Sequence, residues 1–186
     1  MTSRTSRKIR NLSKLQKAIV LQIFVLSSVI LVCFLAGIII NTTPSLPMGI
    51  WRVDNTAPIL NSSLRGRIVT FCPPDTELFR AAKEQGILRV GRCRGAYTPL
   101  LKEVMGVPGD VIEYSDGFLI NGHKIPRSKI LSLNKAVTQP FTGQLIVPNG
   151  KVWIMSSFSA LSFDSRYFGL VSVNSLENIV TPFWIW

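Results

Sequence analysis

The longest pattern in the chain is an apolar run from Ala18 to Ile40 that contains no charged side chain. A helix of this length measures about 34 Å, enough to cross the hydrocarbon core of a bilayer with modest tilt. A cleaved signal peptide has a shorter apolar core and ends in an Ala-x-Ala-like site, which residues 36–40 do not offer. The pattern therefore predicts an uncleaved transmembrane anchor over residues 18–40.

After the anchor the pattern changes to short runs, several of them alternating and β-branched, which are typical of strands. Turn residues at 115–117, 121–122 and 148–150 predict three hairpins, the third of which joins 145–147 to 152–155. Strands are expected over 67–71, 89–95, 111–114, 118–120, 123–125, 145–147, 152–155 and 170–173, the last of them the final strand, with 183–186 left as a short apolar tail.

One short helix is expected among these strands. Asp75 is its predicted N-cap and Gly86 its stop, and the side chains expected to face the core are Leu78, Phe79, Ala82 and Ile87. About 146 residues follow the anchor, enough for one domain and too few to expect two. The predicted fold is a mostly β domain of antiparallel strands with one short helix over residues 41–186, behind a single N-terminal transmembrane helix.

The chain is strongly basic, with a net charge of +11 at pH 7. Six basic residues precede the apolar run with no acidic residue among them, and without these six the net charge falls to +5: Arg4, Arg7, Lys8, Arg10, Lys14 and Lys17. The remaining charge forms no basic stripe, so nucleic-acid binding is not expected. By the positive-inside rule, residues 1–17 are predicted to form a cytoplasmic tail, with the β domain on the far side of the membrane.

The three cysteines divide between the anchor and the outer domain. Cys33 lies in the apolar run, whereas Cys72 and Cys93 lie in the outer domain, in a compartment that permits disulfides. A bridge between these two would enclose the predicted helix and stabilise the fold by roughly 3 kcal/mol. The chain has one histidine and no ligand-spaced cluster, so neither a metal site nor a cofactor is expected.

The stretch 41–51 follows the anchor directly and holds Ser45 between Pro44 and Pro47. Proline fixes its own φ and favours extended conformations in the residue before it, so Ser45 is expected in a stiff, extended segment. Gly49 would let the chain turn or let another backbone approach closely. Two interpretations stay open from this stretch alone: a linker between anchor and domain, or a rigidly held serine nucleophile close to the membrane.

A serine nucleophile needs a base. The single histidine, His123, falls at an Asn-Gly turn and is expected to be a solvated loop residue. Lys102 is the better candidate, since it lies in an apolar segment and burial can lower a lysine pKa by roughly 3–5 units. The alternative is a lysine on the solvent face of a strand.

Three segments resemble the motif boxes of type I signal peptidases, in the same order behind one anchor: residues 43–51, 102–110 and 162–169. The resemblance implies Ser45 as nucleophile and Lys102 as general base. It also implies an oxyanion hole made by the Ser45 N–H and the Thr43 hydroxyl. The remaining roles that it implies are an orienting hydrogen bond to the lysine from Ser162 and a supporting ion pair between Asp164 and Arg166. The family fold implied is an antiparallel β-barrel-like sheet with an apolar, membrane-facing groove.

Within that family the match narrows. Glu103 stands where common members have Arg, and Met155-Ser156-Ser157 stands where they have Gly-Asp-Asn. The chain is most similar to the branch encoded on conjugative plasmids and related mobile elements, in which Asp164 matches a third residue associated with activity. That resemblance implies a single-pass protein of the bacterial inner membrane with a periplasmic catalytic domain. It also implies a pilin precursor as substrate, cut and in some cases cyclised by its own N-terminal amine.

Two other functions are compatible with the sequence. The first is a general signal peptidase that acts on many preproteins. The second is a non-catalytic, membrane-tethered scaffold of a secretion or pilus complex. A cytoplasmic Ser-Lys autoprotease of the repressor type is not supported, because the chain has an anchor and no DNA-binding helix pair.

Overall fold

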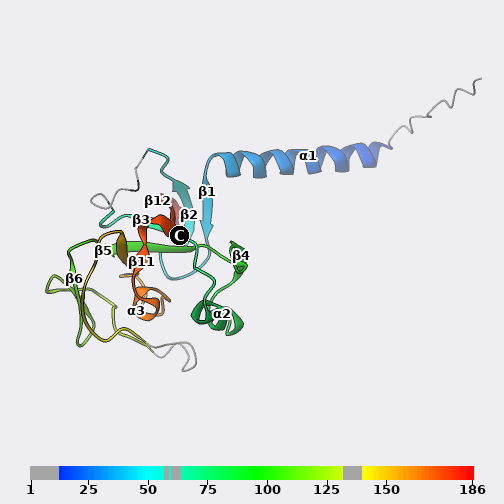
Figure 1. Cartoon of the computed structure of the whole chain (residues 1–186). Helices are drawn as coiled ribbons and strands as arrows, with labels where there is room; N and C mark the ends of the chain where they lie inside the picture. The colour runs from blue at the N-terminus through cyan, green and yellow to red at the C-terminus, as the bar shows by residue number, and fades with distance from the viewer. Residues whose placement is uncertain (1–12, 57–58, 60–63, 132–139) are drawn as a thin grey trace, which may run out of the picture. The chain divides into compact units, whose positions relative to one another are not determined.

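In the computed structural model the described residues are 13–56, 59, 64–131 and 140–186. They fall into two compact units, Met1–Ile38 and Ile39–Trp186. The chain is traced in Figure 1, where each described element carries its colour by residue number. Most of the predicted basic tail, residues 1–12, lies outside the described residues.

The first unit is the helix α1, Lys14–Leu35, which is long and apolar enough to cross a membrane by length and composition. It begins before the predicted span because Ser13 and Gln16 form a reciprocal capping box. It also ends earlier than predicted. Gly37 takes a positive φ of 65°, and the strand β1, Ile38–Asn41, follows, so the last residues of the predicted helix 18–40 are not helical.

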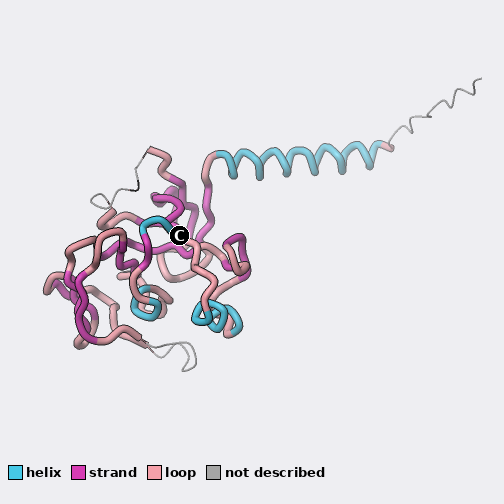
Figure 2. Tube along the Cα trace, viewed as in Figure 1, coloured by secondary structure: helices cyan, strands magenta, loops and turns pink. Residues whose placement is uncertain are grey.

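The second unit is built on a seven-stranded sheet with the order β1-β2-β12-β3-β5-β10-β11. Every pairing that joins β2 to β12, β12 to β3, β3 to β5, β5 to β10 and β10 to β11 is antiparallel. The strands are β2 Gly49–Val53, β3 Ile68–Phe71, β5 Leu100–Gly106, β10 Lys151–Met155, β11 Val171–Ser172 and β12 Leu176–Ile185. The fold is mostly β with a curled antiparallel sheet, as predicted, and Figure 2 shows how strands and loops dominate this unit.

A second sheet has the order β8-β7-β6-β9. Its strands are β6 Val111–Tyr114, β7 Phe118–Ile120, β8 His123–Lys124 and β9 Gly143–Ile146. The first two predicted hairpins are confirmed, because β6 pairs with β7 and β7 with β8. The third is wrong: β9 pairs with β6, whereas β10 pairs with β5 in the larger sheet. The Pro148-Asn149-Gly150 turn carries the chain from one sheet to the other, and a turn signal cannot distinguish this from a hairpin.

The longest strand, β12, was not predicted from the sequence, which placed the final strand at 170–173. It pairs with β2 along its second half and with β3 along its first, so it is an interior strand of the sheet. Pro182 hides this strand in the sequence, because a proline cannot donate a ladder hydrogen bond and argues against an interior strand. In the structure, the pairing with β2 shifts its register between Pro182 and Trp184.

The predicted helix is α2, Glu77–Glu84, but its N-cap is Thr76 and not Asp75. The Asp75 carboxylate instead accepts hydrogen bonds from the Tyr97 hydroxyl and from Arg80, both at 3.0 Å. Phe79 and Ala82 are buried in the main core, and the expected core residues Leu78 and Ile87 are partly buried against it. A four-residue helix, α3 Ser165–Phe168, and a short strand, β4 Val90–Cys93, complete the elements that matter below.

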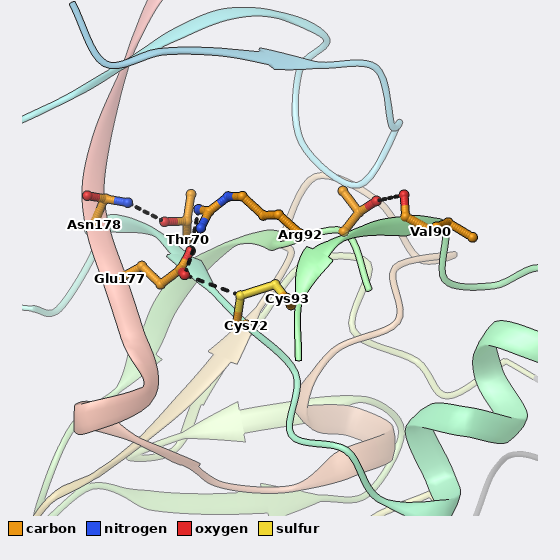
Figure 3. The surroundings of a disulfide bond; sticks show 8 residues. Thr70, Cys72, Val90, Arg92, Cys93, Glu177 and Asn178 are labelled. Carbon is orange, nitrogen blue, oxygen red and sulfur yellow. Dashed lines mark hydrogen bonds and ion pairs between the residues drawn. A yellow bond between two sulfur atoms is a disulfide. The ribbon is translucent and has the colours of Figure 1, made fainter. Parts of the chain in front are cut away.

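The predicted disulfide is present: Cys72 and Cys93 are bridged across α2, with their Cα atoms 5.4 Å apart. Figure 3 shows that Arg92, next to the bridge, reaches Glu177 on β12, and its Nη2 lies 2.6 Å from Glu177 Oε2. The sulfur of Cys72 also lies 3.2 Å from Glu177 Oε1, but a disulfide sulfur has no proton to donate, so Arg92 is the donor to this carboxylate. The bridge and the ion pair together join β4 to the end of β3 and to β12.

Candidate active site

Ser45 lies in a turn between β1 and β2, and not in the extended segment predicted from its flanking prolines. The turn is shaped from within by Asn41, a buried residue at the end of β1. Its side-chain nitrogen lies 3.0–3.1 Å from the carbonyl oxygens of Thr43, Leu46 and Pro47. Its side-chain oxygen accepts from the Thr43 N–H at 3.1 Å. The sequence does not reveal this role of Asn41, because a single asparagine in a Thr- and Pro-containing stretch carries no signal for the contacts of its side chain.

Ser45 is partly exposed, and its hydroxyl lies 3.2 Å from the hydroxyl of Thr43. The Thr43 hydroxyl is also 2.8 Å from Asn41 Oδ1, which can only accept. The Thr43 proton is therefore committed to Asn41, and Ser45 Oγ donates to Thr43 Oγ1 in this state. Thr43 thus lies beside Ser45, where the resemblance placed it.

The turn is fastened to the sheet by apolar packing. Leu46 and Trp51 are buried in a small cluster with Leu101 of β5 and Val180 of β12. Gly49 begins β2 against the backbone of β12, where a Cβ would meet the Trp184 carbonyl oxygen at 2.2 Å. The expected close backbone approach at Gly49 is confirmed, and no other residue fits there without displacing β12.

Lys102 lies in the middle of β5, opposite Val69 on β3, and is 3% exposed. It shares a face of its strand with Val104, which belongs to the main core. The buried alternative is therefore correct and the solvent-facing one is wrong. Burial lowers the pKa of Lys102 to about 8, since a charged amine loses its hydration there, while Asp164 raises this pKa and Arg166 lowers it.

Asp164 and Arg166 form a buried ion pair with both side chains fully enclosed. Arg166 donates to the carboxylate through Nε at 2.8 Å and Nη2 at 2.7 Å, a two-point geometry. Its three remaining N–H groups are shared among five backbone carbonyl oxygens at 3.1–3.5 Å, those of Arg127, Lys129, Ser159, Ala160 and Ser162. The predicted pair is confirmed, but it is a core element and not a surface salt bridge.

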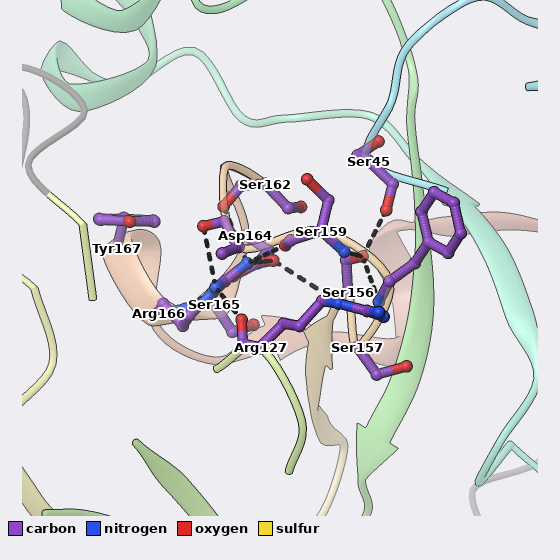
Figure 4. Close-up of polar contacts among 12 residues, drawn as sticks. Ser45, Arg127, Ser156, Ser157, Ser159, Ser162, Asp164, Ser165, Arg166 and Tyr167 are labelled. Carbon is purple, nitrogen blue, oxygen red and sulfur yellow. Dashed lines mark hydrogen bonds and ion pairs between the residues drawn. The ribbon is translucent and has the colours of Figure 1, made fainter. Parts of the chain in front are cut away.

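Ser156 connects this ion pair to the turn that holds Ser45, as Figure 4 shows. Its backbone N–H donates to Asp164 Oδ2 at 3.1 Å, and its hydroxyl donates to the carbonyl oxygen of Ser45. The sequence singled out this position only as a departure from the family pattern. The contact joins residues 111 positions apart, so no local sequence signal could have revealed it.

The other departure, Glu103, is half-buried and accepts a hydrogen bond from Ser157 Oγ at 3.3 Å. Burial raises the pKa of Glu103, and this hydrogen bond lowers it by less. Glu103 on β5 and Ser157 in the segment after β10, both of which differ from the family pattern, thus contact each other.

Ser162 is buried, and its hydroxyl has no hydrogen-bond partner among the described residues. The hydrogen bond to Lys102 that the resemblance implies is therefore not formed here, and the orienting role stays a prediction. Nor does a hydrogen bond join Lys102 to Ser45 within the described part of the chain. His123 is exposed on β8 of the smaller sheet. Among the described residues, no group of three His, Cys, Asp or Glu side chains could hold a metal.

The arrangement combines a partly exposed hydroxyl, a buried amine and a rigid polar network. With a pKa of about 8, about one lysine in ten is neutral at pH 7, whereas an ordinary lysine is neutral only about once in 2,500. Such an amine can accept a proton from an alcohol at physiological pH. The lowered pKa of Lys102 is thus the property that a general base for a serine would need.

Comparisons with known proteins identify the relatives of this chain. The model of the family described as "Signal peptidase, peptidase S26" matches residues 12–185. The conjugal transfer protein TraF of Agrobacterium fabrum is 36% identical over 160 residues, which cover 85% of this chain and 88% of that protein. The plasmid transfer protein TraF of Escherichia coli is 32% identical over 157 residues, 82% of this chain and 85% of that protein.

More distant matches are to signal peptidases themselves. Signal peptidase I V of Bacillus subtilis is 32% identical over 93 residues, which cover 44% of this chain and 55% of that protein. The crystal structure of a signal peptidase I from Enterococcus faecalis covers 63% of this chain and 95% of that chain, with 23% identity and a TM-score of 0.38.

Proposed function

This chain belongs to the signal peptidase family, peptidase S26, and we propose that it is a membrane-anchored serine endopeptidase in which Ser45 is the nucleophile and Lys102 the general base. The observation that carries this proposal is the burial of Lys102 with a pKa of about 8, near an ion pair that Ser156 connects to the Ser45 turn. A buried amine with no structural ion pair of its own is difficult to explain by stability alone.

The reaction proceeds in two acyl-transfer steps. Neutral Lys102 takes the proton of Ser45 Oγ as that oxygen attacks the scissile carbonyl carbon. The oxyanion of the tetrahedral intermediate accepts a hydrogen bond from the Ser45 N–H. It accepts a second from the Thr43 hydroxyl, once that hydroxyl has rotated away from Asn41. The lysine ammonium then protonates the departing amine, which leaves an ester between Ser45 and the acyl part of the substrate. Water or another amine resolves that ester.

The proposed substrate is the precursor of a conjugative pilin. The similarity to proteins named for conjugal and plasmid transfer, over most of both chains, supports this choice. If the precursor's own N-terminal amine attacks the ester, the product is a cyclic pilin. An alternative substrate class is the signal peptides of many exported preproteins. The similarity to signal peptidase I V of Bacillus subtilis is the observation that supports this alternative.

The proposed topology has residues 1–17 in the cytoplasm, α1 across the inner membrane and the β unit in the periplasm. The charge-free apolar helix and the basic flank support this arrangement. The disulfide between Cys72 and Cys93 also suits an oxidising compartment.

Intact mass spectrometry of a candidate pilin precursor tests the proposal. The precursor is co-expressed with the wild-type chain, with Ser45→Ala, or with Ser115→Ala, which alters an exposed turn serine of the smaller sheet. We expect processing with the wild type and Ser115→Ala and none with Ser45→Ala. A trimmed product one water lighter than its linear form would establish cyclisation, and a linear product would establish hydrolysis.

Processing by Ser45→Ala would overturn the catalytic assignment and leave the scaffold function standing. The general signal peptidase alternative has its own test, which is rescue of a cell depleted of its housekeeping enzyme. Rescue would contradict a specialised pilin peptidase.

A further inference from the structure

We propose that Ser156 is a positioning residue for the nucleophile, and that its hydroxyl holds the carbonyl group of Ser45 so that Ser45 Oγ faces Lys102 correctly. The inference rests on the proposed function, because it assumes that Ser45 is the attacking group. It extends that function to a residue outside the three segments that carry the family resemblance.

The hydrogen-bonding capacity of the Ser156 hydroxyl fixes the direction of its proton. The oxygen accepts from the N–H groups of Phe158 at 3.1 Å and Ser159 at 3.0 Å. A hydroxyl has two lone pairs and one proton, so both acceptor positions are filled and the proton remains for the Ser45 carbonyl oxygen. The Ser156 hydroxyl thus makes all three of its possible hydrogen bonds in a single orientation.

The Ser156 side chain is also shielded from solvent. It is fully buried, so its hydroxyl spends its hydrogen bonds on protein groups and not on bulk water. Asn41 shapes the turn from inside the same segment, whereas Ser156 contacts it from the segment that follows β10. The two restraints therefore differ: Asn41 sets the form of the turn, whereas Ser156 holds its backbone from a neighbouring segment, in addition to the apolar packing of Leu46 against the sheet.

The backbone of Ser156 extends the connection to the surroundings of Lys102. Its N–H donates to Asp164 Oδ2, the same oxygen that accepts from Arg166 Nη2. One residue thus ties the nucleophile turn to a buried ion pair whose two charges act on the lysine. Since a displacement of about 1 Å can cost about 100-fold in rate, a loosened turn should reduce turnover while substrate binding is retained.

Four variants of the full-length chain in detergent test this role. Ser156→Ala removes the hydroxyl. Ser156→Thr and Ser156→Val form a matched pair, because both add the same bulk and only Thr keeps a hydroxyl. Ser128→Ala is the control, since the Ser128 hydroxyl is equally buried and hydrogen-bonded, but to Ile125 and Phe118 around the smaller sheet.

Two measurements are made on each variant: kcat and KM for the precursor processed in the mass experiment, and hydrogen exchange of the amides in residues 41–51. For Ser156→Ala and Ser156→Val we expect kcat to fall about 10- to 100-fold, KM to stay within about 3-fold, and exchange in 41–51 to accelerate. Ser156→Thr should recover most of kcat and protection, and Ser128→Ala should match the wild type in both.

The inference is overturned if Ser156→Ala keeps wild-type kcat, or if Thr and Val at this position are equally slow. It is also overturned if Ser156→Ala speeds exchange throughout the β unit as much as in 41–51, which would indicate a merely structural hydroxyl. Failure of the proposed function gives a different result: Ser45→Ala would process the precursor, whatever the Ser156 variants do.

Discussion

Lys102 and Asp110 lie near the two ends of one segment and show two ways of burying a charge. Their exposures are nearly equal, 3% for Lys102 and 4% for Asp110. The Asp110 carboxylate accepts from Arg65 at 2.6 Å, from Asn121 at 2.8 Å and from the Val107 N–H at 2.7 Å. The Lys102 amine has no hydrogen bond to any described residue.

The electrostatic consequences are opposite. Burial raises the pKa of Asp110, but its hydrogen bonds from Arg65, Val107 and Asn121 together lower it below the ordinary value, so its charge is stabilised. Burial lowers the pKa of Lys102, and the attraction of Asp164 does not restore it, so its charge is destabilised. The segment therefore holds a charge that hydrogen bonds stabilise at Asp110 and a charge that burial destabilises at Lys102. The second arrangement is the one that the proposed general-base role requires.

The largest expected effect is that of Lys102→Met, which should separate activity from stability. Loss of the base should reduce processing roughly a thousand-fold or more. Since the folded state holds the lysine at a pKa of about 8 and the unfolded state at its ordinary value, the variant should be about 3 kcal/mol more stable at pH 7. Single-turnover processing and urea unfolding measure the two effects. A variant less stable than the wild type would show that Lys102 is a satisfied structural residue.

Asp164→Asn should have the next largest effect. It leaves the enclosed guanidinium of Arg166 without its counter-charge, which costs about 3–5 kcal/mol of stability. It also removes the carboxylate that raises the pKa of Lys102, so that pKa should fall further. The acidic limb of the kcat/KM profile should then move to lower pH. A shift to higher pH would mean that Asp164 does not act on the lysine through its charge.

The sequence predicted those site residues that carry a local pattern, and not those whose role depends on contacts between distant segments. Lys102 was identifiable because an apolar setting around one lysine is a local pattern, and Ser45 because its flanking prolines offered a rigid serine as one of two interpretations. The resemblance then favoured that interpretation and supplied Asp164 and Arg166. Ser156 was not identifiable, because its role depends on a contact between distant segments. Asn41 was equally hidden, since a side chain that organises a turn leaves no periodic signal.

The fold divides in the same way. Alternating strands and the Asn-Gly turn gave the β class and two hairpins, since both signals are local. The strand β12 and the separation of β9 from β10 depend on which strands meet in space. A proline in β12 and an ordinary turn after β9 point away from the true pairings.

The pH dependence of stability gives a smaller effect of definite sign. Lys102 binds fewer protons in the folded state than in the unfolded state between its folded pKa of about 8 and its ordinary value of 10.5, so stability rises with pH in this window. Between about pH 8 and about pH 10 the gain should be about 2 kcal/mol relative to Lys102→Met, a comparison that cancels other titrating groups. Parallel curves for the two proteins would contradict the lowered pKa.

Asp110→Asn should have the smallest effect and the opposite character to Lys102→Met. Each carboxylate oxygen of Asp110 accepts from an N–H donor, Arg65 at one and Val107 at the other. In either orientation, the asparagine side chain would point its own NH₂ donor at one of these N–H donors. We expect the free energy of unfolding to fall by about 1–2 kcal/mol, a loss that is moderated because Arg65 is half-exposed. We expect kcat/KM to stay unchanged.

The stabilisation by Asp110 depends on pH, because its pKa is lowered in the folded state. The stabilisation is fully present above the ordinary carboxyl pKa of 3.8 and is lost as the pH falls through the folded pKa. The stability difference between wild type and variant should therefore shrink in acid, and a loss of processing at neutral pH would show that this end of the segment also serves the chemistry.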